Sequence, residues 1–140
     1  MARTKLSPHF YADEFDCHDG TPVPPASIPA LRELCVNVLE PLRGKYGACK
    51  VMSGYRHRRY NAQIGGARYS QHIYDDAPAS VAADLIFARG NPASWARSAR
   101  WRFATKSHWR GRRGQRGGCG RYIRSGFIHV DSGPRRNWEG

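Results

Sequence analysis

An apolar run with one charge near its centre constrains this chain more than any other feature. Residues 81–88 read Val-Ala-Ala-Asp-Leu-Ile-Phe-Ala, so Asp84 is the only charged residue in the run. An apolar run of this length is typical of a buried strand. Burying a carboxylate is costly unless it is paired or bound to a metal. Asp84 is therefore predicted to face a charged partner or a metal ion.

Two histidines can form a metal site with Asp84. His72 closes the string Ser70-Gln71-His72, and His129 lies in Phe127-Ile128-His129-Val130-Asp131. Two histidines and a carboxylate are a common catalytic zinc set, which leaves the fourth tetrahedral position for a water whose pKa the metal lowers. The three residues alone also fit two hydrogen-bonded surface histidines beside a paired acid.

The segment around His129 is predicted to be a strand. Residues 121–123 and 127–130 read as two short strands around a Ser125-Gly126 turn. Alternation along the second strand puts Phe127, His129 and Asp131 on one face. Asp131 is therefore a candidate general base for a metal-bound water, or an acid that only orients a ligand.

Arg56 is a candidate for substrate binding. It follows residues 50–54, which read as a short strand that ends at Gly54. A guanidinium fixed at the end of a strand can bind a carboxylate through two parallel hydrogen bonds. A solvated arginine is the plainer alternative.

The first half of the chain is predicted to be scaffold. Residues 1–26 form an N-terminal arm whose aromatic side chains pack on the core. A helix follows, capped by Ser27 and with Pro29 in its first turn. Pro41 is expected to kink or end this helix, and Gly44 and Gly47 to open a turn. The buried face of the helix is formed by Leu31, Leu34, Cys35, Val38 and Leu42.

The net charge of +12 is concentrated in one part of the chain. Eleven of the 23 Lys and Arg residues lie between Asp84 and Asp131, where there is no acid; the rest of the chain has twelve basic and eleven acidic residues. Asn91-Pro92 is expected to begin a helix there, and residues 105–120, rich in Arg and Gly, to form a loop. A local positive field attracts polyanions, either an anionic cell-wall polymer or nucleic acid.

Length and composition favour one globular domain over residues 1–140. The sequence contains no apolar run long enough for a membrane span and no apolar segment typical of a secretory signal. Cys17, Cys35, Cys49 and Cys119 lack the CxxC spacing of a zinc site. They permit two disulfides or four reduced thiols, and the sequence leaves both open.

Six short motifs stand in order along the chain, and together they are far more specific than any one alone. They are Ser53-Gly54-Tyr55-Arg56, Asn61 with Gly65-Gly66, Ser70-Gln71-His72, Ala83-Asp84-Leu85, Gly118-Cys119-Gly120-Arg121-Tyr122 and Phe127-Ile128-His129-Val130-Asp131. This series resembles the M15 zinc peptidases, and more narrowly their D-alanyl-D-alanine carboxypeptidase-like branch, which includes many phage endolysins. The resemblance extends from Leu6 to Trp138.

The resemblance implies a small α+β fold of the Hedgehog/DD-peptidase type, with an antiparallel sheet and flanking helices. One zinc ion per chain would be held by His72, Asp84 and His129. Arg56 would stabilise charge on the substrate or transition state, and Ser70 would help hold the substrate. That substrate would be a peptidoglycan stem peptide, cut at a bond involving a D-amino acid.

The sequence departs from the family pattern between the first two ligands. His72 and Asp84 are twelve positions apart, where the family usually has seven, and residues 75–80 read as a loop insertion. Asp75 and Asp76 in this loop are rival ligands. Asp84 is favoured because it alone has the Ala-Asp-Leu setting.

A second departure concerns the general base. Many members of the wider family place an Asp, Glu or His two or three positions before the last zinc histidine. Here those positions are Phe127 and Gly126, which cannot transfer a proton. Asp131, two positions after His129, is then the candidate base.

These observations favour a zinc-dependent peptidoglycan peptidase. A non-catalytic zinc-stabilised module that binds the cell wall or serves in a virion is the first alternative, and a nucleic-acid binder using the Arg-rich loop is the second. We expect a monomer made in the cytoplasm of the cell or host, which acts on the cell wall or is carried in a virion.

Overall fold

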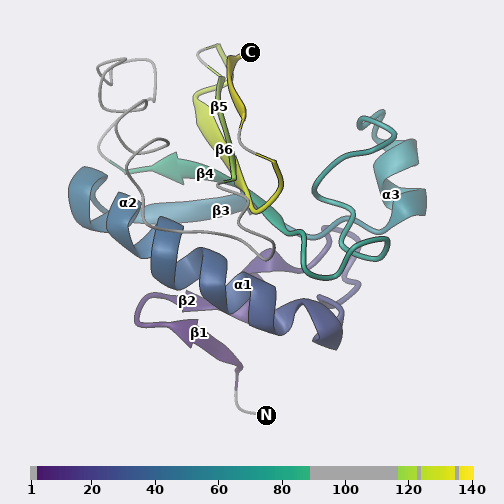
Figure 1. Ribbon diagram of the computed structural model, residues 1–140, viewed down its shortest axis with the longest axis horizontal. Coiled ribbons are helices and arrows are strands. Elements are labelled where there is room, and N and C mark those ends of the chain that lie inside the picture. The colour runs from purple at the N-terminus through teal and green to yellow at the C-terminus, as the bar shows by residue number, and fades with distance from the viewer. Residues whose placement is uncertain (1–2, 89–116, 123, 135) are drawn as a thin grey trace.

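The computed structural model describes residues 3–88, 117–122, 124–134 and 136–140 (Figure 1). A long helix, a five-stranded sheet and a two-stranded sheet make an α+β fold, as the sequence predicts. In chain order the elements are β1 (Lys5–Ser7), β2 (Phe10–Tyr11), η1 (Ala12–Phe15), η2 (Pro25–Ser27), α1 (Ile28–Leu34), η3 (Cys35–Leu39), α2 (Glu40–Tyr46), β3 (Cys49–Ser53), α3 (Arg58–Gln63), β4 (Ala82–Phe87), β5 (Gly118–Tyr122), β6 (Phe127–Asp131) and β7 (Arg136–Glu139).

The five strands of the larger sheet follow the order β3-β4-β6-β5-β7. All neighbours are antiparallel except β5 and β7, which run parallel. This parallel edge differs from the expected antiparallel sheet. The end of β6 lies beside the start of β5, since Asp131 pairs with Gly118. A short connection therefore carries the chain past the start of β5, so that β7 begins there and runs in the same direction.

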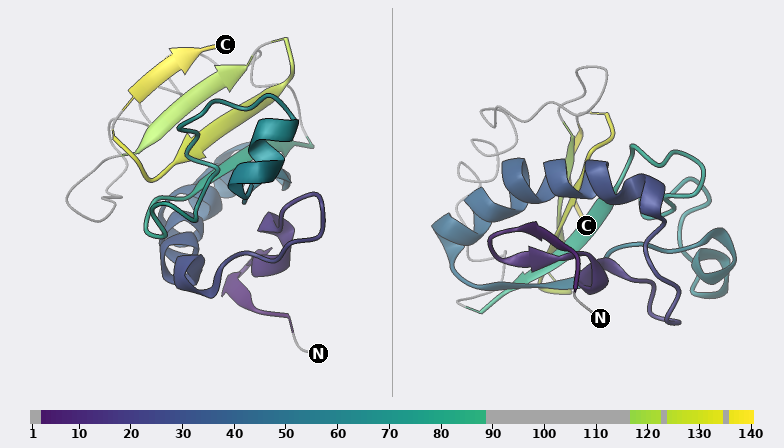
Figure 2. Two further views of the ribbon diagram at one scale, coloured as in Figure 1. Left: turned by 90° about the vertical axis from the view of Figure 1, so that its right-hand side faces the viewer. Right: turned by 90° about the horizontal axis from the view of Figure 1, so that it is seen from below.

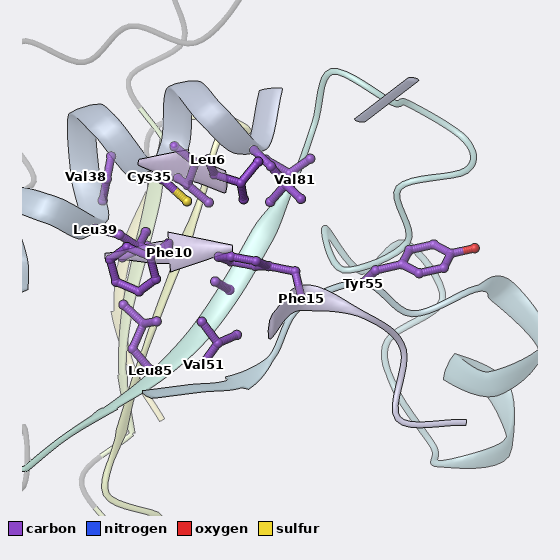
Figure 3. Packing of buried hydrophobic residues seen from close by; sticks show 14 of the residues in the cluster. Leu6, Phe10, Phe15, Cys35, Val38, Leu39, Val51, Tyr55, Val81 and Leu85 are labelled. Carbon is purple, nitrogen blue, oxygen red and sulfur yellow. The ribbon is translucent and has the colours of Figure 1, made fainter. Parts of the chain in front are cut away.

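The helix formed by α1, η3 and α2 lies along one side of the sheet, and the β1–β2 hairpin packs beside it (Figures 1 and 2). Its predicted apolar stripe is buried, with Leu31, Leu34 and Cys35 fully enclosed. Aromatic residues of the N-terminal arm, Phe10 and Phe15, are buried in the same core, as predicted (Figure 3). This core fixes β4, whose buried residues include Asp84.

The helix does not end at Pro41, which was one of the two predicted outcomes, because helical structure continues to Tyr46. Just before Pro41, the five residues of η3 are π-helical. The Glu40 N–H donates to the carbonyl of Cys35, five residues earlier. This wider turn changes the hydrogen-bond pattern just where proline lacks an N–H. Gly44 lies inside α2, and Gly47, with φ of 90°, follows its last residue.

Ser27 does not cap α1 through its side chain. The chain enters the helix through η2, so the Ser27 backbone is already helical (φ −91°, ψ −10°), and no hydrogen bond from its side chain caps α1. A capping hydroxyl needs an extended backbone at this position. Pro29 does lie at the start of α1, as predicted.

The predicted Arg/Gly-rich loop is corrected at its end, since Gly118, Cys119 and Gly120 belong to β5. The rest of that loop, 105–116, and the helix expected after Asn91 lie outside the described residues. Cys17, Cys35 and Cys49 carry free thiols. Within the described ranges, the helices are too short or too polar to cross a membrane.

Candidate metal centre

The three predicted ligands meet on one face of the sheet. Asp84 on β4 and His129 on β6 are direct cross-strand partners, so their side chains project side by side. His72 approaches from the loop between α3 and β4. One possible ligand atom from each of the three lies within 4.8 Å of the others, and all three residues are buried. The sheet register therefore brings together residues that are far apart in the sequence.

His72 is held in the tautomer that suits a metal ligand. Its Nδ1 lies 2.6 Å from the carbonyl oxygen of Gly54, which can only accept a hydrogen bond. The proton of the neutral ring is therefore on Nδ1, and the Nε2 lone pair faces Asp84 Oδ1 at 3.2 Å. This carbonyl belongs to the glycine that follows β3.

His129 is held in the complementary way by Asp131. Its Nε2 lies 2.8 Å from Asp131 Oδ2, while its Nδ1 lies 2.8 Å from Asp84 Oδ1. A carboxylate that accepts the N–H on one side of an imidazole leaves the other nitrogen for a metal. The donor set is then two imidazole nitrogens and one carboxylate oxygen, which fits a three-ligand zinc site.

The acidic and imidazole groups of this cluster stabilise one another's charged forms. Burial alone would raise the pKa of Asp84, but His129, which donates to its carboxylate, and the neighbouring His72 ring hold that pKa well below its usual range. Burial likewise opposes charge on His129, but hydrogen bonds with Asp131 and Asp84 raise its pKa to about 9. In the metal-free protein His129 is thus cationic at neutral pH. A metal at Nδ1 must displace that proton, so metal affinity falls as the pH decreases below this value.

A cavity of about 690 Å³ opens over the three residues. Arg56 and Ser70, both predicted from the sequence, line it together with His72, Asp84 and His129. The Arg56 guanidinium donates to Ser53 Oγ and Asn61 Oδ1, each at 3.3 Å, and its Nη2 lies 3.7 Å from Asp84 Oδ2. Ser70 Oγ accepts the His72 backbone N–H at 3.2 Å.

The rival acids of the insertion loop are bound elsewhere. Asp75 accepts the hydroxyl of Tyr55 at 2.8 and 2.9 Å, and Asp76 pairs with Arg58 on α3. These contacts tie the loop to Tyr55 and to α3. Asp84 is the carboxylate that the structure groups with the two histidines.

A second group, Cys17, Asp19 and His57, is also close enough to hold a metal. His57 Nδ1, however, accepts the backbone N–H of Tyr60 at the start of α3. The proton of the neutral ring is therefore on Nε2, where it is donated to Asp19 Oδ2 at 2.5 Å. His57 therefore caps the N-terminus of α3, and Asp19 holds the His57 ring in place.

The sequence did not reveal the role of Gly120 on β5. Gly120 pairs with His129 on one side and with Trp138 on the other. A Cβ at Gly120 would lie 2.4 Å from the Trp138 indole, so only glycine lets the indole lie across β5. The ring centroids of Trp138 and His129 are 5.3 Å apart. The alternation of Gly118 and Gly120 was the available signal, since it removes two successive side chains from one face of the strand.

The contacts of Asp131 favour the orienting alternative over the general base. Its Oδ1 accepts the backbone N–H groups of Gly118 (3.0 Å) and Gly133 (2.8 Å). Its Oδ2 accepts from His129 and from Arg136 at 3.2 Å. Four donors occupy the four lone pairs of the carboxylate. Burial raises the pKa of Asp131, but the hydrogen bond and charge of His129, together with the N–H groups of Gly133 and Gly118, lower it overall, which also makes a weaker base.

Asp131→Asn is expected to weaken zinc binding by roughly 10–100-fold, because the amide loses the charge that orients His129. Excess zinc is expected to restore most of the lost activity. Zinc titration and peptide hydrolysis at low and saturating zinc measure this, with Asp76→Asn as the control of equal charge. A loss of roughly 10²–10⁴ in rate that saturating zinc does not restore identifies Asp131 as the base instead.

Comparison with known families agrees with this geometry. A family model described as peptidase M15 matches residues 8–131. This range includes the three candidate ligands, Arg56 and Ser70, whereas β7 lies beyond it. Comparison with curated proteins and with solved structures found no match. With a family match over most of its length, and two histidines and an aspartate grouped as a metal site, the chain belongs to the M15 peptidase family.

Proposed function

We propose that the protein is a zinc-dependent peptidase that hydrolyses peptidoglycan stem-peptide bonds involving D-amino acids. The observation that carries the proposal is the grouping of His72, Asp84 and His129 under an open cavity. A buried hydrogen-bond acceptor orients the ring of each histidine. The narrower likeness to D-alanyl-D-alanine carboxypeptidases, including phage endolysins, rests on the sequence motifs. The cell wall is then the site of action.

His72, Asp84 and His129 would hold a zinc ion, which would supply a Lewis acid to polarise a peptide carbonyl and activate water. Arg56 lies beside Asp84 and donates to the carbonyl oxygen as negative charge develops there. Its contacts with Ser53 and Asn61 fix the guanidinium before the substrate arrives. The Ser70 hydroxyl donates to the substrate backbone at the cavity wall. Asp131 keeps the His129 ring in place.

One observation favours the non-catalytic alternative, a zinc-stabilised module that binds the wall or serves in a virion. Among the described residues that line the cavity, Asp84 is the only carboxylate, and it belongs to the ligand set. Asp131 is enclosed by its four donors. In that alternative the zinc would stabilise the site, and the cavity would bind its target without a general base to cut it.

Metal analysis of the purified protein, with mass spectrometry of digested peptidoglycan, tests both functions. We expect one zinc per chain and new peptide ends at a bond involving a D-amino acid. His72→Ala is the matched inactive control, and it should lose both zinc and products. Firmly held zinc with wall binding but no products supports the non-catalytic module, and a wild-type protein that takes up no zinc contradicts both.

The basic segment between Asp84 and Asp131, which includes the Arg/Gly-rich residues 105–120, is proposed to bind anionic wall polymer. Its larger part, residues 89–116, lies outside the described residues, so the proposal rests on its charge. Within the same proposal the protein acts as a monomer, and nucleic acid is not its partner.

A further inference from the structure

Arg136 on β7 reaches the metal centre because the strand between has no side chain in the way. Gly118 on β5 pairs with Asp131 on one side and with Arg136 on the other. A Cβ at Gly118 would lie 2.6 Å from Asp131 Oδ2. With glycine there, Arg136 Nη2 lies 3.2 Å from the same oxygen. The Arg136 guanidinium is thus joined to His129 through a single buried carboxylate.

The Arg136 guanidinium is fixed on two sides and open on a third. Its Cζ lies 4.9 Å from the centroid of the Trp138 ring, and one nitrogen contacts Asp131. Half of the side chain remains exposed, and it lines the cavity over the candidate ligands. A guanidinium held over an aromatic ring keeps its in-plane N–H groups, apart from the one donated to Asp131, for a planar anion, and little freedom is lost when that anion binds.

The charges around the cavity leave Arg136 available to a substrate anion. The negative charge of Asp84 is taken up by the metal ligand set and Arg56, and Asp131 is shared between His129 and one nitrogen of Arg136. With a divalent ion bound, the described lining residues have excess positive charge. Arg56 follows β3 and Arg136 lies on β7, which are the two edges of the sheet. The two guanidiniums therefore flank the metal position.

We propose that Arg136 binds a free carboxylate of the peptide substrate and thereby selects substrates that carry one near the scissile bond. This inference rests on the proposed peptidase function. A carboxylate matches the fork of N–H groups on a guanidinium, which gives two parallel charge-assisted hydrogen bonds. The carboxylate can be the C-terminal one or that of an acidic side chain.

Three matched peptides separate these sources. One ends in two D-alanines, carries an acidic side chain further from the end, and has both carboxylates free; the others have either the terminus or the side chain converted to an amide. We expect wild-type kcat/KM for the free acid to exceed that for one of the two amides by about 10–100-fold. The amidated peptide with the lower kcat/KM shows which of the two carboxylates, terminal or side-chain, Arg136 binds. In Arg136→Gln this ratio is expected to fall to about 1.

Three comparisons show whether a change in the ratio comes from Arg136 itself. Arg136→Lys keeps the charge but not the fork, and it should restore part of the ratio. Arg124→Gln removes an equal charge from the exposed turn after β5 and should keep the wild-type ratio. Zinc content is measured for each variant, because Arg136 also contacts Asp131. A purely structural role lowers turnover of the acid and the amides alike.

Binding of the same peptides, measured by calorimetry with and without zinc, keeps the inference testable if nothing is cut. Weaker binding of one amide to the wild-type protein, with that difference lost in Arg136→Gln, supports the inference even when the proposed peptidase function fails. Equal dissociation constants for the acid and both amides in the wild-type protein overturn it. An acid-to-amide ratio that survives in Arg136→Gln also overturns it, while the peptidase function stands.

Discussion

Asp84→Asn is expected to leave a folded protein that no longer holds stoichiometric zinc and no longer cuts peptides. The amide is nearly the same size as the carboxylate, so the packing of β4 survives. It lacks the negative charge that both histidine rings and Arg56 face. Metal analysis after dialysis, peptide hydrolysis and circular dichroism check the three parts of this expectation.

The matched controls are Asp75→Asn and Asp76→Asn, which remove the same charge from the insertion loop. Their partners are Tyr55 and Arg58, so zinc should be retained in both. Full zinc occupancy in Asp84→Asn, with loss of zinc in either control, shows that a loop acid is the ligand. His129→Ala and His72→Ala should resemble Asp84→Asn.

Arg56→Ala is expected to keep zinc and to lose about 10²–10³ in kcat, the usual effect of removing one donor to a developing oxyanion. Arg56 is not one of the grouped ligands, although it lies beside Asp84. A loss confined to kcat, with KM little changed, indicates an interaction made in the transition state. Steady-state kinetics at saturating zinc provide the measurement.

Arg59→Ala is the control for Arg56→Ala, because it removes an equal charge from the exposed face of α3. It should leave kcat unchanged. If Arg56→Ala loses zinc together with activity, Arg56 acts by holding Asp84. If it cuts at the wild-type rate, Arg56 has no part in the reaction.

The local pattern of the sequence was enough to predict the strand around Asp84 and the buried stripe of the long helix. Alternation and the i, i+3, i+4 spacing depend only on neighbouring residues, so they are visible without the fold. The same reasoning did not predict that the helix continues past Pro41, next to a π-helical turn. Hydrogen-bond changes of this kind have no signature in the spacing of apolar residues.

The candidate ligands could be named from the sequence, but their supports could not. The Gly54 carbonyl that orients His72 is a backbone atom, and any residue type supplies one. Arg136 and Trp138 reach the site through glycines of β5, which depends on the sheet register and on a parallel edge strand. Register between distant strands is a tertiary property. The enclosure of Asp131 by four donors likewise appears only once β5, β6 and β7 are paired.

The pairing of Asp84 with His129 also limits when the candidate metal site can form during synthesis of the chain. The long helix, β3 and β4 are complete once residue 87 has been made, whereas the partner of Asp84 lies 45 residues later. Pairing over such a separation is slow, because a long loop must close first. A nascent chain that stops before β6 contains the residues of the helix, β3 and β4 but only two of the three candidate ligands. A metal site that needs all three residues can therefore form only after β6 has been made and has paired with β4.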